Sequence, residues 1–156
     1  MSSKRIKFDC KLEQKQNDSV HIIRNVMSED QEILAKAMLD AYMGTVDQME
    51  DTFDEALTEV RNILNGGYGQ FIAKASFLIE QNDEAASVIL VNLYDGKPLI
   101  TEIFTGKIYY RQGMAGVLIR ASMNVLFEMG YEELVLNVMP ENIGAIKLYE
   151  GLGFRG

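Results

Sequence analysis

The sequence predicts one α+β (α/β) domain over residues 1–156, with a central mixed sheet flanked by about four helices. Three observations predict this fold class. Two helical patterns lie between residues 28 and 67. Three strand patterns joined by short polar turns follow, which indicates an antiparallel meander. The chain then runs through a helix, a strand and a short helix, and its length is ordinary for one domain.

Two strand patterns open the chain. Apolar and polar residues alternate from Ile6 to Leu12 and again from Val20 to Val26, as in half-buried strands. The polar residues Gln16 to Ser19 between them are typical of a turn. We therefore expect an opening pair of strands.

Two helices follow the opening strands. Ser28 to Gln31 reads as a capping box with Ser28 as the N-cap, and this first helix is expected to end near Gly44. A second helix is expected from about Asp51 to the Asn65-Gly66-Gly67 stop. Both have apolar residues at i, i+3 and i+4 spacing: Ile33, Leu34, Ala37, Met38 and Ala41 in the first, and Phe53, Ala56, Leu57, Val60, Ile63 and Leu64 in the second.

The rest of the chain predicts the meander and a crossover. The strands are expected at Phe71 to Glu80, Ala86 to Tyr94 and Pro98 to Thr105, with turns at 81–84 and 95–97. A helix over Gly113–Met129 should stop at Gly130. The strand from Leu134 to Met139 should lie parallel to the strand before that helix, because strand–helix–strand connections of this length are right-handed crossovers. A short helix then runs through Tyr149.

The turn between Thr105 and the long helix predicts an anion site. The first N–H groups of a helix lack intrahelical partners, and the helix dipole adds partial positive charge there. Gly113 and Gly116 would let a phosphate or pyrophosphate approach the backbone.

Two ordered blocks resemble the GNAT superfamily of acyl-CoA-dependent N-acyltransferases. Tyr110-x-x-Gly113-x-Ala115 resembles the family fingerprint R/Q-x-x-G-x-G/A, although Tyr110 stands where Arg or Gln is usual and Arg111 is one residue further along. The second block resembles a strand followed by N-x-x-A-x-x-x-Y and G-F. Its residues here are Asn142, Ala145, Tyr149, Gly153 and Phe154.

The resemblance implies a GNAT-like sheet whose parallel strand pair splays apart at an acetyl-CoA (CoA) site. It places the CoA pyrophosphate on the backbone of the anion turn, the pantetheine arm near Asn142, and the thioester carbonyl at free amides near Phe104 and Thr105. The cofactor-binding residues implied are Phe104, Thr105, Tyr110, Arg111, Gln112, Gly113, Met114, Ala115, Gly116 and Asn142.

Tyr149 and Glu102 are the candidate catalytic residues. The resemblance makes the Tyr149 phenol the acid that protonates the departing thiolate, while the residues alone also fit a core aromatic beside Leu148 and Leu152. Glu102 is the candidate base because burial between Ile100 and Phe104 would raise its pKa. A half-exposed strand glutamate and a water-mediated route are the alternatives. His21 is assigned no role.

Charge and composition limit the classes of molecule that this protein is expected to bind. The net charge is −8, and residues 27–59 hold ten acidic residues against Lys36 alone. The remainder has no basic stripe, which disfavours nucleic acid. The acidic helices are either a solvated face or an attraction for a cationic amine. Cys10 cannot form an internal disulfide, no Cys or His cluster suits a metal, and no run is long enough to span a membrane, so a cytoplasmic location is expected.

The sequence therefore predicts an N-acyltransferase that moves acetyl from acetyl-CoA to a primary amine, on a small molecule or a peptide, by direct attack. The resemblance also implies a strand pair after Phe154, which here is short or missing. That departure and Tyr110 motivate the alternative of a degenerate GNAT domain that binds CoA or a partner without turnover. A nucleotide-binding α/β module is disfavoured by the helices over 28–64. The amine, the acyl chain and the oligomeric state, a homodimer among the options, are left open.

Overall fold

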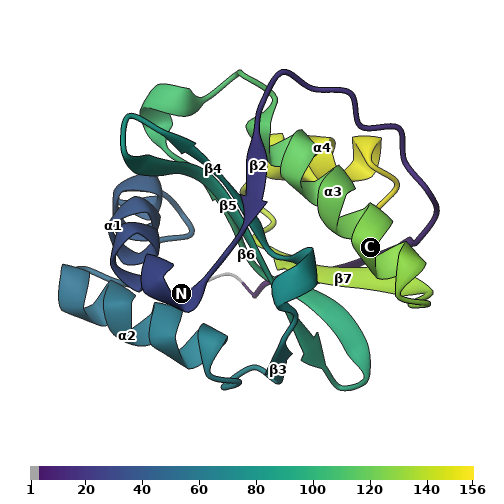
Figure 1. Cartoon of the computed structure of the whole chain (residues 1–156), viewed down its shortest axis with the longest axis horizontal. Coiled ribbons are helices and arrows are strands. Elements are labelled where there is room, and N and C mark those ends of the chain that lie inside the picture. The colour runs from purple at the N-terminus through teal and green to yellow at the C-terminus, as the bar shows by residue number, and fades with distance from the viewer. Residues whose placement is uncertain (1–3) are drawn as a thin grey trace.

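A seven-stranded mixed sheet with helices on both faces forms the molecule, which was analysed as a computed structural model describing residues 4–156 (Figure 1). This confirms the predicted α+β class. The helices are α1 (Gln31–Tyr42), α2 (Phe53–Leu64), α3 (Met114–Glu128) and α4 (Ile143–Gly151). The strands are β1 (Ile6–Lys11), β2 (Ile23–Asn25), β3 (Gln70–Phe71), β4 (Phe77–Gln81), β5 (Glu84–Tyr94), β6 (Lys97–Thr105) and β7 (Glu133–Val138). Among these residues no helix is long and apolar enough to cross a membrane.

The predicted meander is the centre of the sheet. The strand order is β1-β7-β6-β5-β4-β2, with β3 beside β5, and every pair except β6–β7 is antiparallel. Both hairpin turns have positive φ at their central residues, 54° and 59° at Asn82 and Asp83 and 53° and 78° at Asp95 and Gly96. This backbone matches the twist of the flanking strands.

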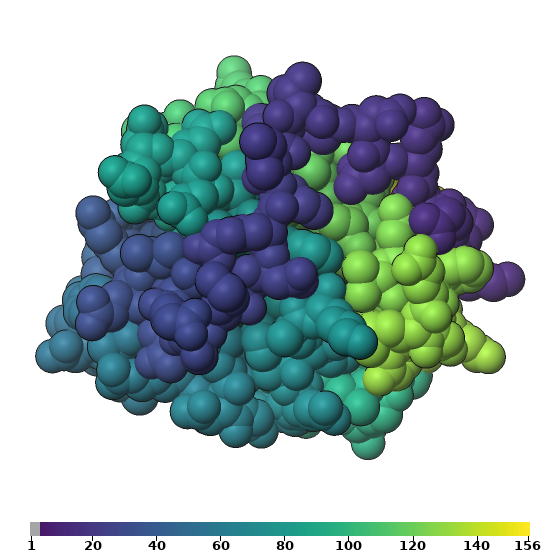
Figure 2. Space-filling view, in the orientation of Figure 1, coloured from purple at the N-terminus to yellow at the C-terminus, as the bar shows by residue number. Residues whose placement is uncertain are grey.

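The expectation that the two opening strands pair with each other is wrong. β1 pairs with β7, whereas β2 pairs with β4 near the opposite edge of the sheet. β2 is also shorter than predicted, because Val20 and Ile22 are 95% and 87% exposed and bury no apolar face. The residues between the strands form no hairpin turn; they run along the outer surface of α3 (Figure 2).

Two apolar layers hold the helices to the sheet. Successive residues of β5 point to opposite faces: Val88 and Leu90 pack under α1 and α2, while Ile89 and Val91 pack under α3. A strand covered on both faces reads as a continuous apolar run, which is how residues 88–91 look in the sequence.

The predicted strand Phe71 to Glu80 is interrupted. A 3-10 turn, Ala73–Ala75, separates β3 from β4. The buried Ser76 explains the break, because its hydroxyl donates to the carbonyl of Ile72 at 2.9 Å and accepts the N–H of Val91 at 2.9 Å. A serine that bonds its own backbone in this way competes with a regular strand ladder.

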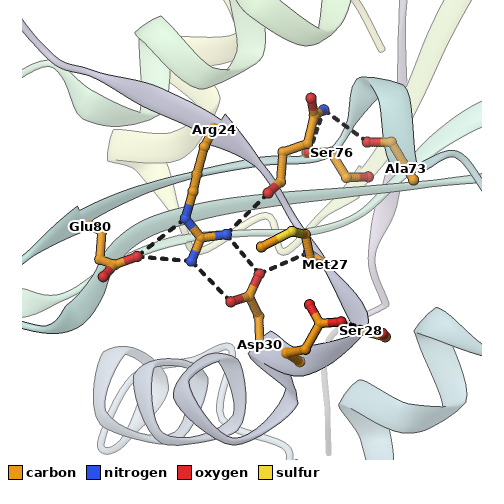
Figure 3. Close-up of polar contacts among 9 residues, drawn as sticks. Arg24, Met27, Ser28, Asp30, Ala73, Ser76 and Glu80 are labelled. Carbon is orange, nitrogen blue, oxygen red and sulfur yellow. Dashed lines mark hydrogen bonds and ion pairs between the residues drawn. The ribbon is translucent and has the colours of Figure 1, made fainter.

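The start of α1 is held by Asp30 rather than by the predicted Ser28 cap (Figure 3). Buried Asp30 accepts the N–H of Met27 at 2.7 Å and both terminal nitrogens of Arg24 at 2.8 and 2.9 Å. Arg24 also binds Glu80 of β4 at 2.8 Å, so this cluster joins β2, β4 and the first turn before α1. The Arg24 guanidinium holds the pKa of Asp30 below its usual range.

The parallel pair is short, and this opens the sheet. β6 and β7 are paired only at Leu99 with Val135 and at Ile100 with Leu136. Beyond these positions the two strands diverge, as the resemblance implied. The other edge of β7 is covered by β1, and the backbone of Arg155 bridges Asp9 of β1 with hydrogen bonds of 2.9 and 2.8 Å.

Candidate active site

A cavity of about 430 Å³ lies where β6 and β7 diverge. Its floor comes from the two strands, and its walls come from the end of α1, the loop between α1 and α2, α2 itself and α4. The lining brings together three residues singled out from the sequence, Glu102, Asn142 and Tyr149. They come from β6, the start of α4 and its last turn, so the chain folds the two candidate catalytic residues and one predicted cofactor-binding residue around one space.

Glu102 faces this cavity and is held by Tyr42 at the end of α1. The Tyr42 hydroxyl donates to Glu102 Oε1 at 2.8 Å and also lies 3.1 Å from the carbonyl oxygen of Ile103. Burial raises the pKa of Glu102 to about 8, and the hydrogen bond from Tyr42 offsets part of that effect. Tyr42 was missed in the sequence, where it is one more aromatic on an amphipathic helix.

Tyr149 is a core aromatic that also borders the cavity. Its ring is a core aromatic that packs edge-to-face on Phe154 with centroids 5.9 Å apart, and the residue is 7% exposed. The residue also lines the cavity, and among residues 4–156 no hydrogen-bond partner of its hydroxyl is found. Burial raises the pKa of Tyr149, so its phenol is protonated at neutral pH.

Asn142 ties α4 to the loop between α1 and α2. Its side-chain oxygen caps α4 by accepting the N–H of Ala145 at 3.2 Å, and its Nδ2 donates to Asp47 Oδ2 at 2.9 Å. Arg5 binds the other oxygen of Asp47 at 3.3 Å. Asp47 therefore joins the N-terminal segment, the acidic loop and the start of α4 at the edge of the cavity.

The predicted anion turn has an open geometry at the start of α3. Gly113 is the N-cap with a φ of 74°, and no atom lies within 4 Å of where a Cβ would be. Tyr110 is 51% exposed, and Arg111 and Gln112 are also exposed. Met114 is buried and anchors the first turn of α3 in the core. The backbone of this turn is therefore accessible from the surface, and the buried Met114 fixes its position at the start of α3.

His21, assigned no role from the sequence, contacts this turn. Its Nε2 lies 2.7 Å from the carbonyl oxygen of Gln112. Asn17 of the same segment binds α3: it donates to the Val117 carbonyl at 3.1 Å and accepts from Arg120 at 3.1 Å. Contacts across 91 to 103 residues leave no local signal, so sequence patterns could not reveal them.

The direction of the backbone groups along β6 shows which amides face the gap between β6 and β7. The Phe104 carbonyl accepts from Ser87 of β5 at 3.2 Å, while the Ile103 carbonyl accepts from Tyr42 on the cavity side. Because backbone groups alternate in direction along a strand, the amides of Ile103 and Thr105 face the diverging edge. The amide of Phe104, which was also predicted, faces β5.

The acidic residues of the segment 27–59 have different positions and partners in the structure. Asp47, Glu50 and Glu59 line the cavity, whereas Asp30 holds the start of α1 and Glu55 caps α2 by accepting the N–H of Thr52. Glu59 accepts the Tyr68 hydroxyl at 2.7 Å, and this bond raises the pKa of Tyr68 to about 12. Within residues 4–156, no three His, Cys, Asp or Glu side chains are grouped to hold a metal.

Comparisons with known proteins agree with this geometry. The model of the acetyltransferase (GNAT) family matches residues 45–154. Comparison with curated proteins by sequence gave no match.

Solved structures share the fold at low identity. A GCN5-related N-acetyltransferase from Sphaerobacter thermophilus superposes with a TM-score of 0.75 at 16% identity, covering 98% of this chain and 49% of that one. The chain thus spans about half the length of that relative. The ribosomal-protein-S18-alanine N-acetyltransferase from Escherichia coli gives 0.67 at 21% identity, covering 86% of this chain and 77% of that one. AAC(6')-Iy, solved with the bisubstrate analog CoA-S-monomethyl-acetylneamine, gives 0.65 at 20% identity, covering 88% and 92%.

Proposed function

Because this chain belongs to the acetyltransferase (GNAT) family, we propose that it transfers the acetyl group of acetyl-CoA to a primary amine by direct attack. The observation that carries the proposal is the cavity between β6 and β7, where Glu102 and Tyr149 lie next to the gap in the sheet. Ligands of sheets with parallel strands bind at the carboxyl ends of those strands, which is where this cavity opens.

The anion turn is suited to hold the pyrophosphate of CoA. The amides at the start of α3 are free of intrahelical partners and carry the positive end of the helix dipole. Space around Gly113 allows a phosphate to approach the backbone. Because this binding uses main-chain groups, it does not need the Arg or Gln that Tyr110 replaces. Acetyl-CoA supplies the activated acetyl thioester.

The pantetheine arm would pass along the divergence of β6 and β7, close to Asn142. The amides of Ile103 and Thr105 face this gap and can donate to the thioester carbonyl as negative charge develops on its oxygen. Such fixed backbone donors stabilise the transition state without reorganising during the reaction.

Glu102 is suited to take a proton from the acceptor. A base works best when its pKa lies near the operating pH, and the pKa of Glu102 is raised to about 8. The hydrogen bond from Tyr42 fixes the orientation of the carboxylate. Glu102 therefore removes one proton from the ammonium group and releases it to solvent, which leaves a neutral amine able to attack.

Tyr149 is suited to protonate the sulfur. As the new nitrogen–carbon bond forms and the carbon–sulfur bond breaks, its phenol gives a proton to the departing thiolate. The second proton lost by the nitrogen replaces it, so the step is balanced. Because burial raises the pKa of Tyr149, the phenol still carries its proton when the thiolate departs.

Two similar structures relate to the two kinds of acceptor predicted from the sequence, a peptide and a small molecule. One relative acetylates an alanine of a ribosomal protein, and another was solved with an acetylated neamine analog. Either acceptor class would present an amine at the cavity between β6 and β7.

The proposed activity is tested by release of the CoA thiol from acetyl-CoA in the presence of a panel of primary amines. Turnover that needs an amine and falls in the Glu102→Gln and Tyr149→Phe proteins is the expected result. Thermal stabilisation by CoA without turnover of any small amine or peptide would instead favour a domain that binds CoA without catalysis.

A further inference from the structure

The acidic wall of the cavity has no role in the acetyl transfer itself. Glu102 alone serves as the base, yet Asp47, Glu50 and Glu59 also line the same space. Arg5 is the one cationic residue among the lining residues described, and it is bound to Asp47. When all four carboxyl groups are ionised, three negative charges of this lining therefore stay uncompensated.

Glu50 and Glu59 are the uncompensated pair nearest the base. The carboxylate of Glu59 is bonded by the neutral hydroxyl of Tyr68, and Glu50 has no side-chain partner among residues 4–156. Both acids raise the pKa of Glu102, so they act on the same small volume. Burial and the charges of Glu59 and Glu55 raise the pKa of Glu50. These carboxylates repel one another in the free protein, and a cation placed between them would relieve that repulsion.

A second observation, independent of the acids, indicates that a ligand enters here. Tyr149 is more than nine-tenths buried, and its hydroxyl lines the cavity without a hydrogen-bond partner in the described chain. Within residues 4–156 no fully enclosed side-chain N or O atom lacks a hydrogen-bond partner, so the Tyr149 hydroxyl is open to the cavity and can bond a molecule that enters it. The hydroxyl and the acids therefore point into one site.

The remaining lining fits a short hydrocarbon chain. Leu99, Ile100 and Ile103 of β6 provide apolar surface, and Tyr68 and Tyr94 provide aromatic rings that accept methylene groups or a cation. The volume of about 430 Å³ lies in the range of small-molecule sites and is small for a folded peptide segment.

From these contacts we infer that the acceptor is a small aliphatic diamine or polyamine, whose second ammonium group binds at Glu50 and Glu59 while the reacting amine lies at Glu102. This inference rests on the proposed acetyl transfer and names its substrate class. The charge balance supports it, because deprotonation by Glu102 makes the reacting amine neutral. Only a second cationic group remains to neutralise the acidic wall.

Matched pairs of amines test this inference. Diaminobutane and diaminopentane differ from butylamine and pentylamine by one terminal ammonium group. Calorimetric binding to the protein with CoA, and thiol release from acetyl-CoA, are measured for each pair at low ionic strength, where surface charges are least screened. We expect each diamine to bind at least about tenfold more tightly than its monoamine, with kcat/KM higher by a similar factor.

Two variants locate the effect. Glu50→Gln removes a charge from the wall without removing a hydrogen-bond partner, and it should reduce the diamine preference to about threefold or less. Asp40→Asn removes the same charge from the exposed side of α1, outside the cavity, and should keep the full preference.

The outcomes separate this inference from the proposed function. Equal binding of diamines and monoamines, or an equal loss of preference in Asp40→Asn and Glu50→Gln, would overturn the diamine site. If monoamines or peptides are acetylated as efficiently, only the substrate class is wrong. Strong diamine binding without any turnover would support the cation site and reject the acetyl transfer.

Discussion

Replacing Glu102 by glutamine should make the protein more stable and less active. The amide side chain introduced by Glu102→Gln cannot ionise, but its oxygen can still accept the hydrogen bond from Tyr42. In the native protein the pKa of Glu102 rises from the ordinary 4.5 to about 8, mainly by burial. Between these two values the folded protein holds a proton that the unfolded chain releases, so stability falls as pH rises and then levels off above about pH 8.

The size of the effect follows from the width of this window. At about 1.36 kcal/mol per pKa unit, the full window corresponds to about 5 kcal/mol. Glu102 is partly exposed to the cavity, and solvent there screens its charge, so we expect about 2 kcal/mol at pH 8. For a chain of this length that gain is roughly a 4–8 °C rise in Tm.

Thermal melts of both proteins from acidic to alkaline pH provide the assay. The two Tm curves should meet near pH 4.5, separate progressively up to about pH 8 and then run parallel. In the same variant kcat should fall by about 10²–10⁴. Parallel melting curves across the whole range would show that the carboxyl titrates normally, and the argument for Glu102 as a base tuned by burial would then be wrong.

Three further substitutions probe the turn, the acid and the scaffold. CoA at a hundredfold excess over Kd should stabilise the native protein by about 2.7 kcal/mol and so raise its Tm. Gly113→Val should abolish this rise in Tm. Gly130→Val, which introduces the same backbone strain at the other end of α3, should keep it. Tyr149→Phe should keep CoA affinity and Tm near their native values but lower kcat by about 10²–10⁴; a native kcat with a thioester of poor leaving group would leave water as the donor. Asp30→Asn should cost about 2 kcal/mol in denaturant unfolding at neutral pH. Because the pKa of Asp30 is lowered, this difference should shrink as pH falls below about 3.8, and a constant difference would contradict the ion pair.

Local patterns were enough to predict most elements of the fold. The helices at 31–42 and 53–64, the three central strands and the crossover through α3 each carry their own periodicity and stop signals. Their arrangement as a meander followed by a right-handed crossover follows from short connections and chain chirality. The divergence of β6 and β7 was implied by the resemblance to GNAT proteins and not by the residues.

The edges of the sheet could not be predicted in this way. Alternation identified the strand pattern of Ile6 to Leu12 and half of the second one, but alternation does not name a partner. β1 pairs with β7, which lies more than 120 residues away in sequence. The polar stretch at residues 16–19, which was predicted to be a turn, belongs to a segment that runs along α3. Strand pairing across such distances depends on the complete core, which a local pattern does not contain.

The same limit applies to the site. Glu102, Asn142 and Tyr149 were found because each lies in a pattern, either a buried strand or a family block. The residues that orient the site come from outside the region that the family model matches, residues 45–154: Tyr42 binds Glu102, Arg5 binds Asp47, and His21 meets the carbonyl of Gln112. Tyr42, Arg5 and His21 thus contact the proposed base, the edge of the cavity and the proposed anion turn, and all three lie before the region that the family model matches. In the mechanism that we propose, groups within residues 45–154 carry out the acetyl transfer, and residues before that region hold several of these groups in place.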